Sequence, residues 1–302
     1  MTSRTPTNAL TEQCLRRRAP LSRSLVKCEL FAESSSRRLF KARHQEFEQL
    51  HIRTAVVPQP HDRGDRVAPI TLYMMQIVSS SPPASTASSS HGQWVVCRRF
   101  SEFWQFRRAL LEQIKAWEAS LSVREKEAKE FIAMSNSLRR AFANDFPRKH
   151  IRIDTAAIIA ERRVGLQDFL RRLLTVYADA SIYIKHSRRG SDDSHRLMTA
   201  MCDAISAFLN VPSWQKELEA LQTAAVLALQ DVDPDSLAPE DDSGYKCCIC
   251  MTDDETTGVV HLLGEDKLVK LPCAHHFHED CILDWFNTSM TCPLCRTCVV
   301  AK

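Results

Sequence analysis

The sequence has 302 residues, of which 44% are hydrophobic and 25% charged, and its formal net charge is +3. This composition is typical of soluble globular proteins, and the length suggests two domains. The longest uninterrupted apolar run, residues 224–229, is far shorter than the roughly 20 residues that a membrane span requires, and the N-terminus lacks the apolar segment of a secretory signal. The glycine spacing excludes the usual nucleotide-binding loops and the serine-hydrolase elbow.

Charge and cysteine are both distributed unevenly. Residues 1–230 carry 35 Lys and Arg against 23 Asp and Glu, whereas residues 231–302 carry 5 against 14. Eight of the 12 cysteines fall within the last 56 residues, where histidines are interleaved with them. The charge asymmetry indicates two modules with different partners. Without a secretory signal, the cysteine pattern favours metal binding in a reducing compartment over disulfides.

The N-terminal residues 1–45 are rich in Ser, Thr and Arg and sustain no apolar periodicity. We therefore predict a disordered basic arm there. A mitochondrial transit peptide is an alternative, although Glu12, Glu29 and Glu33 argue against it because such peptides are poor in acids.

Three runs rich in β-branched and aromatic residues then predict strands at 51–57, 70–78 and 94–100. Apolar residues at helical spacing follow, and we expect them to pack in a core. These stripes are Phe103, Phe106, Leu110, Ile114 and Trp117; Leu166, Phe169, Leu170, Leu173 and Tyr177; and Met198, Met201, Ile205 and Phe208. Strands followed by helices indicate an α+β domain over residues 46–212.

Two connecting segments follow this domain. Residues 213–230 predict a further helix, which either caps the domain or pairs with another chain. Residues 231–243 hold six acidic residues, no Lys or Arg, and two prolines, so we predict an extended acidic linker.

The C-terminal residues 244–298 carry a regular series of metal-binding side chains. Its members are Cys247, Cys250, Cys273, His275, His278, Cys281, Cys292 and Cys295. Eight such ligands suit two tetrahedral zinc ions, and a Cys-x2-Cys pair lets two thiolates face one ion. Four protein ligands close each site, so the zinc would be structural and not hydrolytic. Cys298 could form another such pair with Cys295, and Cys248 and His276 adjoin ligands.

The spacing, together with Cys-Ala-His-His-Phe-His-Glu-Asp-Cys-Ile over 273–282 and Cys-Pro-Leu-Cys-Arg over 292–296, closely resembles a RING finger of the H2 subtype. His275 argues against the related PHD and RING-CH modules, which place a cysteine there. The resemblance implies two cross-braced zinc sites and makes Cys248, His276 and Cys298 bystanders. The implied sites are Cys247, Cys250, His278 and Cys281, and Cys273, His275, Cys292 and Cys295.

RING fingers of this type act as ubiquitin ligases that hold a ubiquitin-charged conjugating enzyme (E2) and are not themselves covalently modified. The resemblance therefore implies no catalytic nucleophile. It assigns Ile249, Trp285 and Pro293 to the E2-binding surface and Arg296 to contacts with both ubiquitin and the E2. Arg suits the latter role because it carries several fixed donors.

Three basic patches in the preceding domain resemble those of a PX domain, a phosphoinositide-binding module with a three-stranded sheet and a helical subdomain. They are Arg98-Arg99-Phe100, Phe146-Pro147-Arg148-Lys149 and Glu161-Arg162-Arg163. The resemblance implies that Arg99 binds the 3-phosphate, Phe100 supports the inositol ring, Lys149 meets the 1-phosphate and Arg163 binds the ring hydroxyls. The implied lipid is phosphatidylinositol 3-phosphate.

Together the two resemblances predict a RING-type E3 ubiquitin ligase that is cytoplasmic and peripheral on endosomal membranes, with an E2, a phosphoinositide membrane and an unknown protein substrate as partners. The alternative is a trafficking adaptor, similar to a sorting nexin, whose RING is only a zinc-stabilised interaction module. A nucleic-acid partner is not expected, because the basic residues lack interleaved aromatic residues.

Overall fold

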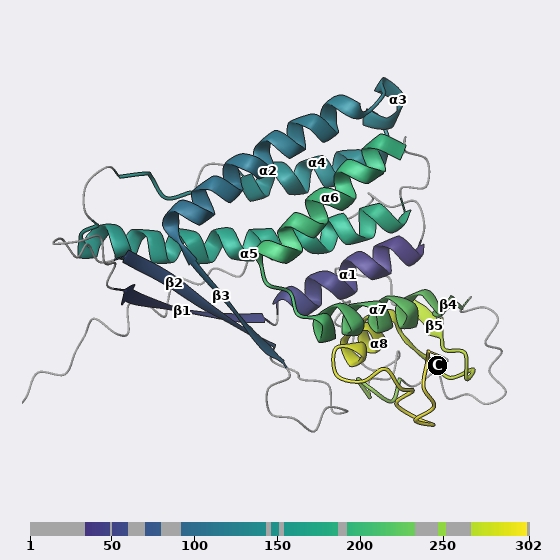
Figure 1. Cartoon of the computed structure of the whole chain (residues 1–302). Coiled ribbons are helices and arrows are strands. Elements are labelled where there is room, and N and C mark those ends of the chain that lie inside the picture. The colour runs from purple at the N-terminus through teal and green to yellow at the C-terminus, as the bar shows by residue number, and fades with distance from the viewer. Residues whose placement is uncertain are drawn as a thin grey trace, which may run out of the picture.

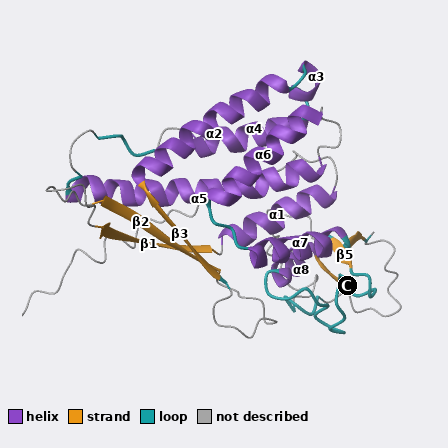
Figure 2. Cartoon of the chain, in the orientation of Figure 1, coloured by secondary structure: helices purple, strands orange, loops and turns teal. Residues whose placement is uncertain are grey.

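The computed structural model describes most of the chain, with a helical body, a sheet on one side and a small C-terminal unit on the other (Figure 1, Figure 2). The described residues are 34–48, 50–59, 70–79, 92–142, 146–150, 154–186, 192–232, 247–251 and 267–300. The predicted α+β class is confirmed.

The sheet is antiparallel, with the strand order β1-β2-β3. Its strands are β1 (Leu50–Gln59), β2 (Ile70–Ser79) and β3 (Gln93–Arg99). Alternate residues of the central strand, Tyr73, Met75 and Ile77, are fully buried, as expected where one face of a sheet packs on a core. The three predicted strands are confirmed, with ends that differ by at most two residues.

The helices of the body pack on the buried face of the sheet and on one another. They are α2 (Phe100–Ser120), α3 (Val123–Lys126), α4 (Lys129–Phe142), α5 (Ala156–His186), α6 (Asp192–Phe208) and α7 (Ser213–Leu227). The three predicted apolar stripes lie on α2, α5 and α6 and contribute to one hydrophobic core. Within the described ranges, every helix is too short or too polar to pass through a bilayer.

A further helix, α1 (Ser34–Glu48), lies between α5 and α7 (Figure 1). The prediction of a disordered arm is therefore wrong for residues 34–45, while residues 1–33 lie outside the described residues. The buried face of α1 includes Arg38 and Arg43, which are 1% and 3% exposed. Because arginines occupy buried positions, the sequence of this helix shows no apolar stripe.

The chain passes from α7 directly into the C-terminal unit. There β4 (Gln230–Asp231) pairs with β5 (Leu268–Lys270), β5 pairs with β6 (His276–His278), and α8 (Glu279–Phe286) follows. The predicted acidic linker is therefore wrong at its first two residues: Asp231 lies in β4, and the Val232 N–H donates to the Leu268 carbonyl at 3.1 Å. Residues 233–243 lie outside the described residues.

The C-terminal unit shares a hydrophobic core with the helical body. From the body come Leu39, Phe40 and Ala42 of α1, Ile182 of α5, and Ala225, Val226 and Leu229 of α7 and its C-terminal end. From the C-terminal unit come Val269, Leu271, Phe277, Ile282, Leu283 and Phe286, among others. Burial of this mixed set joins the two modules by packing, so they are not merely tethered.

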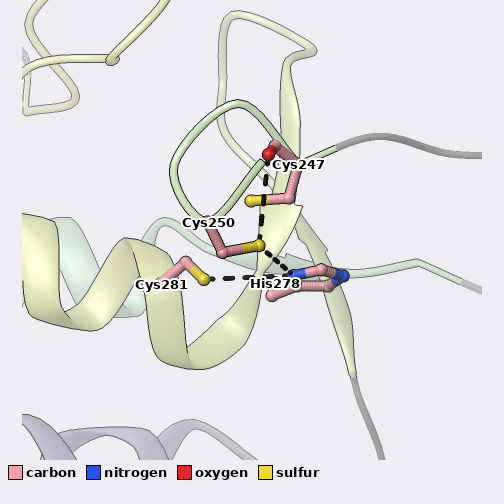
Figure 3. A group of neighbouring side chains, drawn as sticks. All are labelled: Cys247, Cys250, His278 and Cys281. Carbon is pink, nitrogen blue, oxygen red and sulfur yellow. Dashed lines mark hydrogen bonds between the residues drawn. The ribbon is translucent and has the colours of Figure 1, made fainter. Parts of the chain in front are cut away.

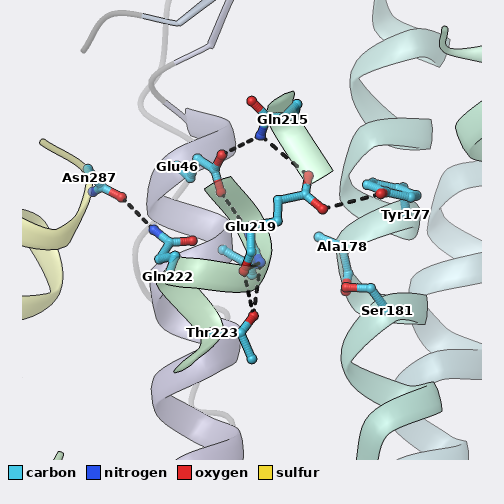
Figure 4. A network of polar contacts seen from close by, with 10 residues as sticks. Glu46, Tyr177, Ala178, Ser181, Gln215, Glu219, Gln222, Thr223 and Asn287 are labelled. Carbon is cyan, nitrogen blue, oxygen red and sulfur yellow. Dashed lines mark hydrogen bonds and ion pairs between the residues drawn. The ribbon is translucent and has the colours of Figure 1, made fainter. Parts of the chain in front are cut away.

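Buried polar side chains meet where α1, α5 and α7 converge (Figure 4). Glu219 of α7, 8% exposed, accepts a hydrogen bond from the Tyr177 hydroxyl at 3.2 Å and another from Gln215 Nε2 at 3.3 Å. Gln215 also donates to Glu46 of α1 at 2.7 Å. Burial raises the pKa of Glu219, and the opposing effect of the nearby Arg43 is smaller.

This environment predicts that Glu219→Gln is at least as stable as the wild type at pH 8. A carboxyl group whose pKa is raised by folding stabilises the protein fully below its unfolded pKa, and that contribution is lost as pH rises through the folded value. The amide imitates the neutral acid, so any advantage of the variant over wild type in urea unfolding should shrink as the pH falls through the raised pKa of Glu219 toward the ordinary carboxyl value of 4.5.

The matched control is Glu217→Gln, which removes an exposed carboxylate from the same helix and should change the free energy of unfolding by less than about 0.5 kcal/mol. A Glu219→Gln variant that is clearly less stable than this control at pH 8 would mean that Glu219 is held ionised by Arg43.

Candidate functional site

Two groups of cysteine and histidine side chains lie in the C-terminal unit. One consists of Cys247, Cys250, His278 and Cys281 (Figure 3), and the other of Cys273, His275, Cys292 and Cys295. Within each group the potential ligand atoms all lie within 4.8 Å of one another. The structure thus brings together the two sets expected from the sequence.

The spacing of these atoms fits tetrahedral zinc. Zinc–sulfur bonds of about 2.3 Å and zinc–nitrogen bonds of about 2.0–2.1 Å place sulfur and nitrogen ligands about 3.6 Å apart in a tetrahedron. The Sγ–Nδ1 distances are 3.3 Å for Cys250–His278, 3.9 Å for Cys281–His278, 3.3 Å for Cys273–His275 and 3.6 Å for Cys292–His275. A donor set of soft thiolates and imidazoles is the one zinc prefers, so the residues fit this metal.

Short turns hold the ligands in place. Three residues with left-handed backbone conformations each directly follow a ligand: Met251 (φ 55°), Ala274 (φ 68°) and Arg296 (φ 59°). In all three turns the left-handed residue donates its N–H to a carbonyl three or four residues earlier: Met251 to Cys247 at 2.8 Å, and Ala274 to Leu271 and Arg296 to Cys292, both at 2.9 Å. This conformation costs about 1–2 kcal/mol for a residue other than glycine, so its recurrence beside ligands indicates that the site imposes it.

The protein environment raises the pKa of some ligand thiols and lowers that of another. Burial raises the pKa of Cys292 to about 11 and also raises the pKa of Cys281. The exposed Cys295 has its pKa lowered to about 6, mainly by hydrogen bonds from Thr297. Metal binding needs thiolates, so loading the buried ligands would release protons.

The neighbouring Cys248, His276 and Cys298 belong to neither group within the described residues. Cys248 and Cys298 are exposed, and the Cys298 thiol donates to the Val300 carbonyl at 3.1 Å. Burial lowers the pKa of the half-buried His276.

The residues assigned to the E2 surface flank the two metal groups. Ile249 and Trp285 are half-buried and pack against the shared core. The Trp285 Nε1–H donates to the Thr291 carbonyl at 2.8 Å, which ties α8 to the turn carrying Pro293. Arg296 is exposed at the end of that turn.

Two apolar residues that the sequence analysis missed extend this surface. Met251 is 78% exposed and Leu294 is 52% exposed. Met251 directly follows the ligand Cys250, and Leu294 lies between Pro293 and the ligand Cys295. In the sequence, these two positions could have been recognised only as apolar residues next to metal ligands, in turns expected to lie on the surface.

A second candidate site lies at the start of α2 and in the first turns of α5. The Arg162 guanidinium lies 3.8 Å from the centre of the Phe100 ring and pairs with the carboxylate of Asp154. Phe146 lies beside Phe100, with ring centres 6.0 Å apart. Phe100 and Arg162 are only 9% and 4% exposed, so the guanidinium stacks on a buried aromatic ring.

The structure places the residues predicted from the PX resemblance unequally. Arg99 is exposed at the end of β3, directly before Phe100. Lys149 is exposed with its ammonium group 4.7 Å from the centre of the Trp104 ring, about one turn along α2 from Phe100. Arg163 is also exposed, but it is the preceding residue, Arg162, that contacts Phe100.

Helical phase explains this difference of one residue. Arg162 lies four residues before the buried Leu166, so the two side chains share one face of α5. Arg163 falls on the neighbouring, exposed face. The spacing from the buried Leu166 therefore shows which of the two arginines faces Phe100. The Arg162-Arg163 dipeptide alone does not show this.

Comparison with known families agrees with this geometry. The family model described as PX domain matches residues 86–178, and the one described as Ring finger domain matches residues 245–296. The chain contains a PX domain and a RING finger. Phe100 and Arg162 fall within the residues that match the PX domain. Both cysteine–histidine groups fall within the residues that match the Ring finger domain.

Several proteins named as ubiquitin ligases share part of the sequence. E3 ubiquitin-protein ligase RNF181 of Danio rerio is 32% identical over 95 residues, which are 31% of this chain and 54% of the relative. E3 ubiquitin-protein ligase RLIM of Homo sapiens is 40% identical over 63 residues, 21% of this chain and 9% of the relative. E3 ubiquitin-protein ligase At4g11680 of Arabidopsis thaliana is 44% identical over 61 residues, 20% of this chain and 13% of the relative. The chain thus spans about half of the first relative and much less of the others.

Proposed function

We propose that the protein is a RING-type E3 ubiquitin ligase that a phosphoinositide recruits to membranes. The observation that carries the ligase half is the C-terminal unit itself. Its two ligand groups hold Ile249, Trp285 and Pro293 beside the exposed Met251 and Leu294. A small apolar surface with a few anchors is what a transient protein interface needs.

Two zinc ions would be held by the two cysteine–histidine groups. They would supply structural cross-links, because four protein ligands close each site against water. The protein's own side chains would then bind the partners. Ile249 and Trp285 bind the E2, and the exposed Arg296 donates hydrogen bonds to the E2 and to ubiquitin. Ubiquitin passes from the E2 to a substrate lysine without a covalent intermediate on this chain.

The ligase proposal predicts that Ile249→Ala lowers ubiquitin-chain formation by about tenfold or more, since loss of an interface anchor costs more than about 1 kcal/mol. Chain formation with a panel of E2 enzymes measures the effect. The control is Val123→Ala on α3, an equally apolar side chain that is 76% exposed in the PX module, which should leave activity unchanged.

The RING must remain folded for this comparison, so both variants should retain the zinc content of the wild type. Wild-type protein that forms no chains with any E2 would favour the adaptor function, in which the RING only binds partners.

The lipid half of the proposal rests on Arg162 held over the Phe100 ring with Arg99 exposed beside it. We assign Phe100 to support the inositol ring, and guanidinium groups bind phosphate through paired hydrogen bonds. We assign phosphatidylinositol 3-phosphate as the lipid, Arg99 to its 3-phosphate and Lys149 to its 1-phosphate. We assign the ring hydroxyls to Arg162, which contacts Phe100, in place of the neighbouring Arg163 that the PX resemblance implied. Endosomal membranes, where this lipid is displayed, would then be the working location, and proteins confined to the same surface would be the substrates.

A further inference from the structure

The RING and the lipid-binding residues lie at opposite ends of one helix. α5 runs without interruption from Ala156 to His186, with Arg162 near its start and Ile182 near its end. Ile182 belongs to the core that the RING shares with α1 and α7. At 1.5 Å per residue, the 20 residues between Arg162 and Ile182 span about 30 Å.

α1 connects the RING to this helix through its buried arginine. Arg38 Nε donates to Glu279 at 2.8 Å, and another of its nitrogens pairs with Asp231. Glu279 is the first residue of α8 and directly follows the zinc ligand His278, while Asp231 lies in the strand that α7 feeds into the RING sheet. Arg38 therefore binds two parts of the RING from one position.

On its other faces the same helix contacts α5 and α7 of the helical body. His44 Nε2 lies 3.0 Å from Asp179 of α5, and Arg43 donates to Thr223 of α7 at 3.0 Å. At the rim of the RING contact, Lys41 pairs with Asp280 of α8. Apolar packing of Leu39 and Phe40 against the RING core lies between these polar contacts.

We propose that α1 is a brace that fixes the RING in one orientation on the PX module, with Arg38 as its positioning residue. The E2-binding surface is then held at a constant distance and angle from the phosphoinositide site, and α5 acts as the spacer. This inference concerns the relative placement of the two modules, so it holds whether or not the chain transfers ubiquitin.

The test measures the distance between the modules in the full chain. Non-cysteine probes are attached at Ala160 on α5 and at Thr288 after α8, which are both exposed, so the zinc ligands stay untouched. Wild-type protein should give one narrow distance distribution, and Arg38→Met should at least double its width while lipid binding is retained. Methionine preserves much of the side-chain volume but removes the charge and the donors.

The matched control is Arg37→Met, which removes the same charge from the adjacent, exposed position of α1 and should leave the distribution narrow. A broad distribution in the wild type, or a narrow one in Arg38→Met, would overturn the proposal.

A second measurement needs no substitution and applies even if Arg38→Met fails to fold. When a chelator unfolds the RING of the wild type, amide exchange in residues 34–48 should accelerate by at least about tenfold, because α1 loses its contacts with α8 and the RING core. Amides of β2 and β3 should keep their exchange rates. Unchanged exchange in α1 would overturn the proposal.

Discussion

Arg162→Gln is expected to weaken binding to liposomes carrying phosphatidylinositol 3-phosphate by about 10- to 100-fold, the range that corresponds to losing a charged hydrogen-bonding partner. The Arg162 guanidinium is 4% exposed at the side chain, is stacked on Phe100 and is oriented by Asp154. A group so fixed loses little conformational freedom when it binds a ligand. Arg99→Ala should cause a loss of similar size if Arg99 binds the 3-phosphate.

Arg163→Gln is the matched control, because it removes the same charge from the next residue of α5. Its exposed side chain should affect affinity only through long-range electrostatics, so binding should fall by no more than about threefold. Thermal unfolding should first establish that both variants are folded. Equal losses of affinity in the two variants would then mean that lipid binding depends on the charge of α5 and not on the position of Arg162 over Phe100.

Loss of one zinc ligand is expected to abolish chain formation. We expect the wild-type chain to hold two zinc ions, and Cys295→Ala to hold fewer. Cys295 is exposed, so its replacement leaves no cavity and acts through the metal. In small zinc modules metal binding supplies the folding free energy, so the E2 surface should be lost with the ion. Zinc content by elemental analysis and chain formation on the same samples measure both effects.

Cys298→Ala provides the control for this substitution. Cys298 is also exposed and lies three residues away, but it is outside both ligand groups. It should retain two zinc ions and full activity. Zinc loss in Cys298→Ala, or a full complement in Cys295→Ala, would show that the second site uses a different cysteine.

The sequence predicted those parts of the fold that follow from periodicity and spacing. The β-branched runs of β2 and β3 and the apolar stripe of α5 each bury one face, so residue type alone reports their structure. The eight ligands were likewise visible, because zinc coordination restricts both residue type and spacing.

The sequence did not predict α1, because this helix buries charge. Arg38 and Arg43 resemble residues of a solvated arm. Apart from Glu46, which pairs with Arg43, their side-chain partners lie far away in sequence, at Asp231, Glu279 and Thr223. The sequence did predict a helix at 213–230, where α7 lies, but not which residues it buries: its buried residues include Gln215 and Glu219, whereas its Leu221 is 48% exposed. Tertiary pairing of this kind leaves no local pattern.

The unpredicted helix also changes how the two modules should behave. A flexible linker would let the RING and the PX domain unfold independently. The shared core and the α1 contacts instead imply that loss of the RING weakens α1 and α7 as well.

The most direct test of the proposed function is ubiquitin-chain formation by the full chain on liposomes with and without phosphatidylinositol 3-phosphate, at matched total lipid and with a membrane-tethered substrate. Recruitment to the same surface should raise the rate by about tenfold or more, and Arg162→Gln should remove that gain without lowering the rate in solution. A rate that the lipid does not change, or the absence of chains in both conditions, would contradict a membrane-recruited ligase.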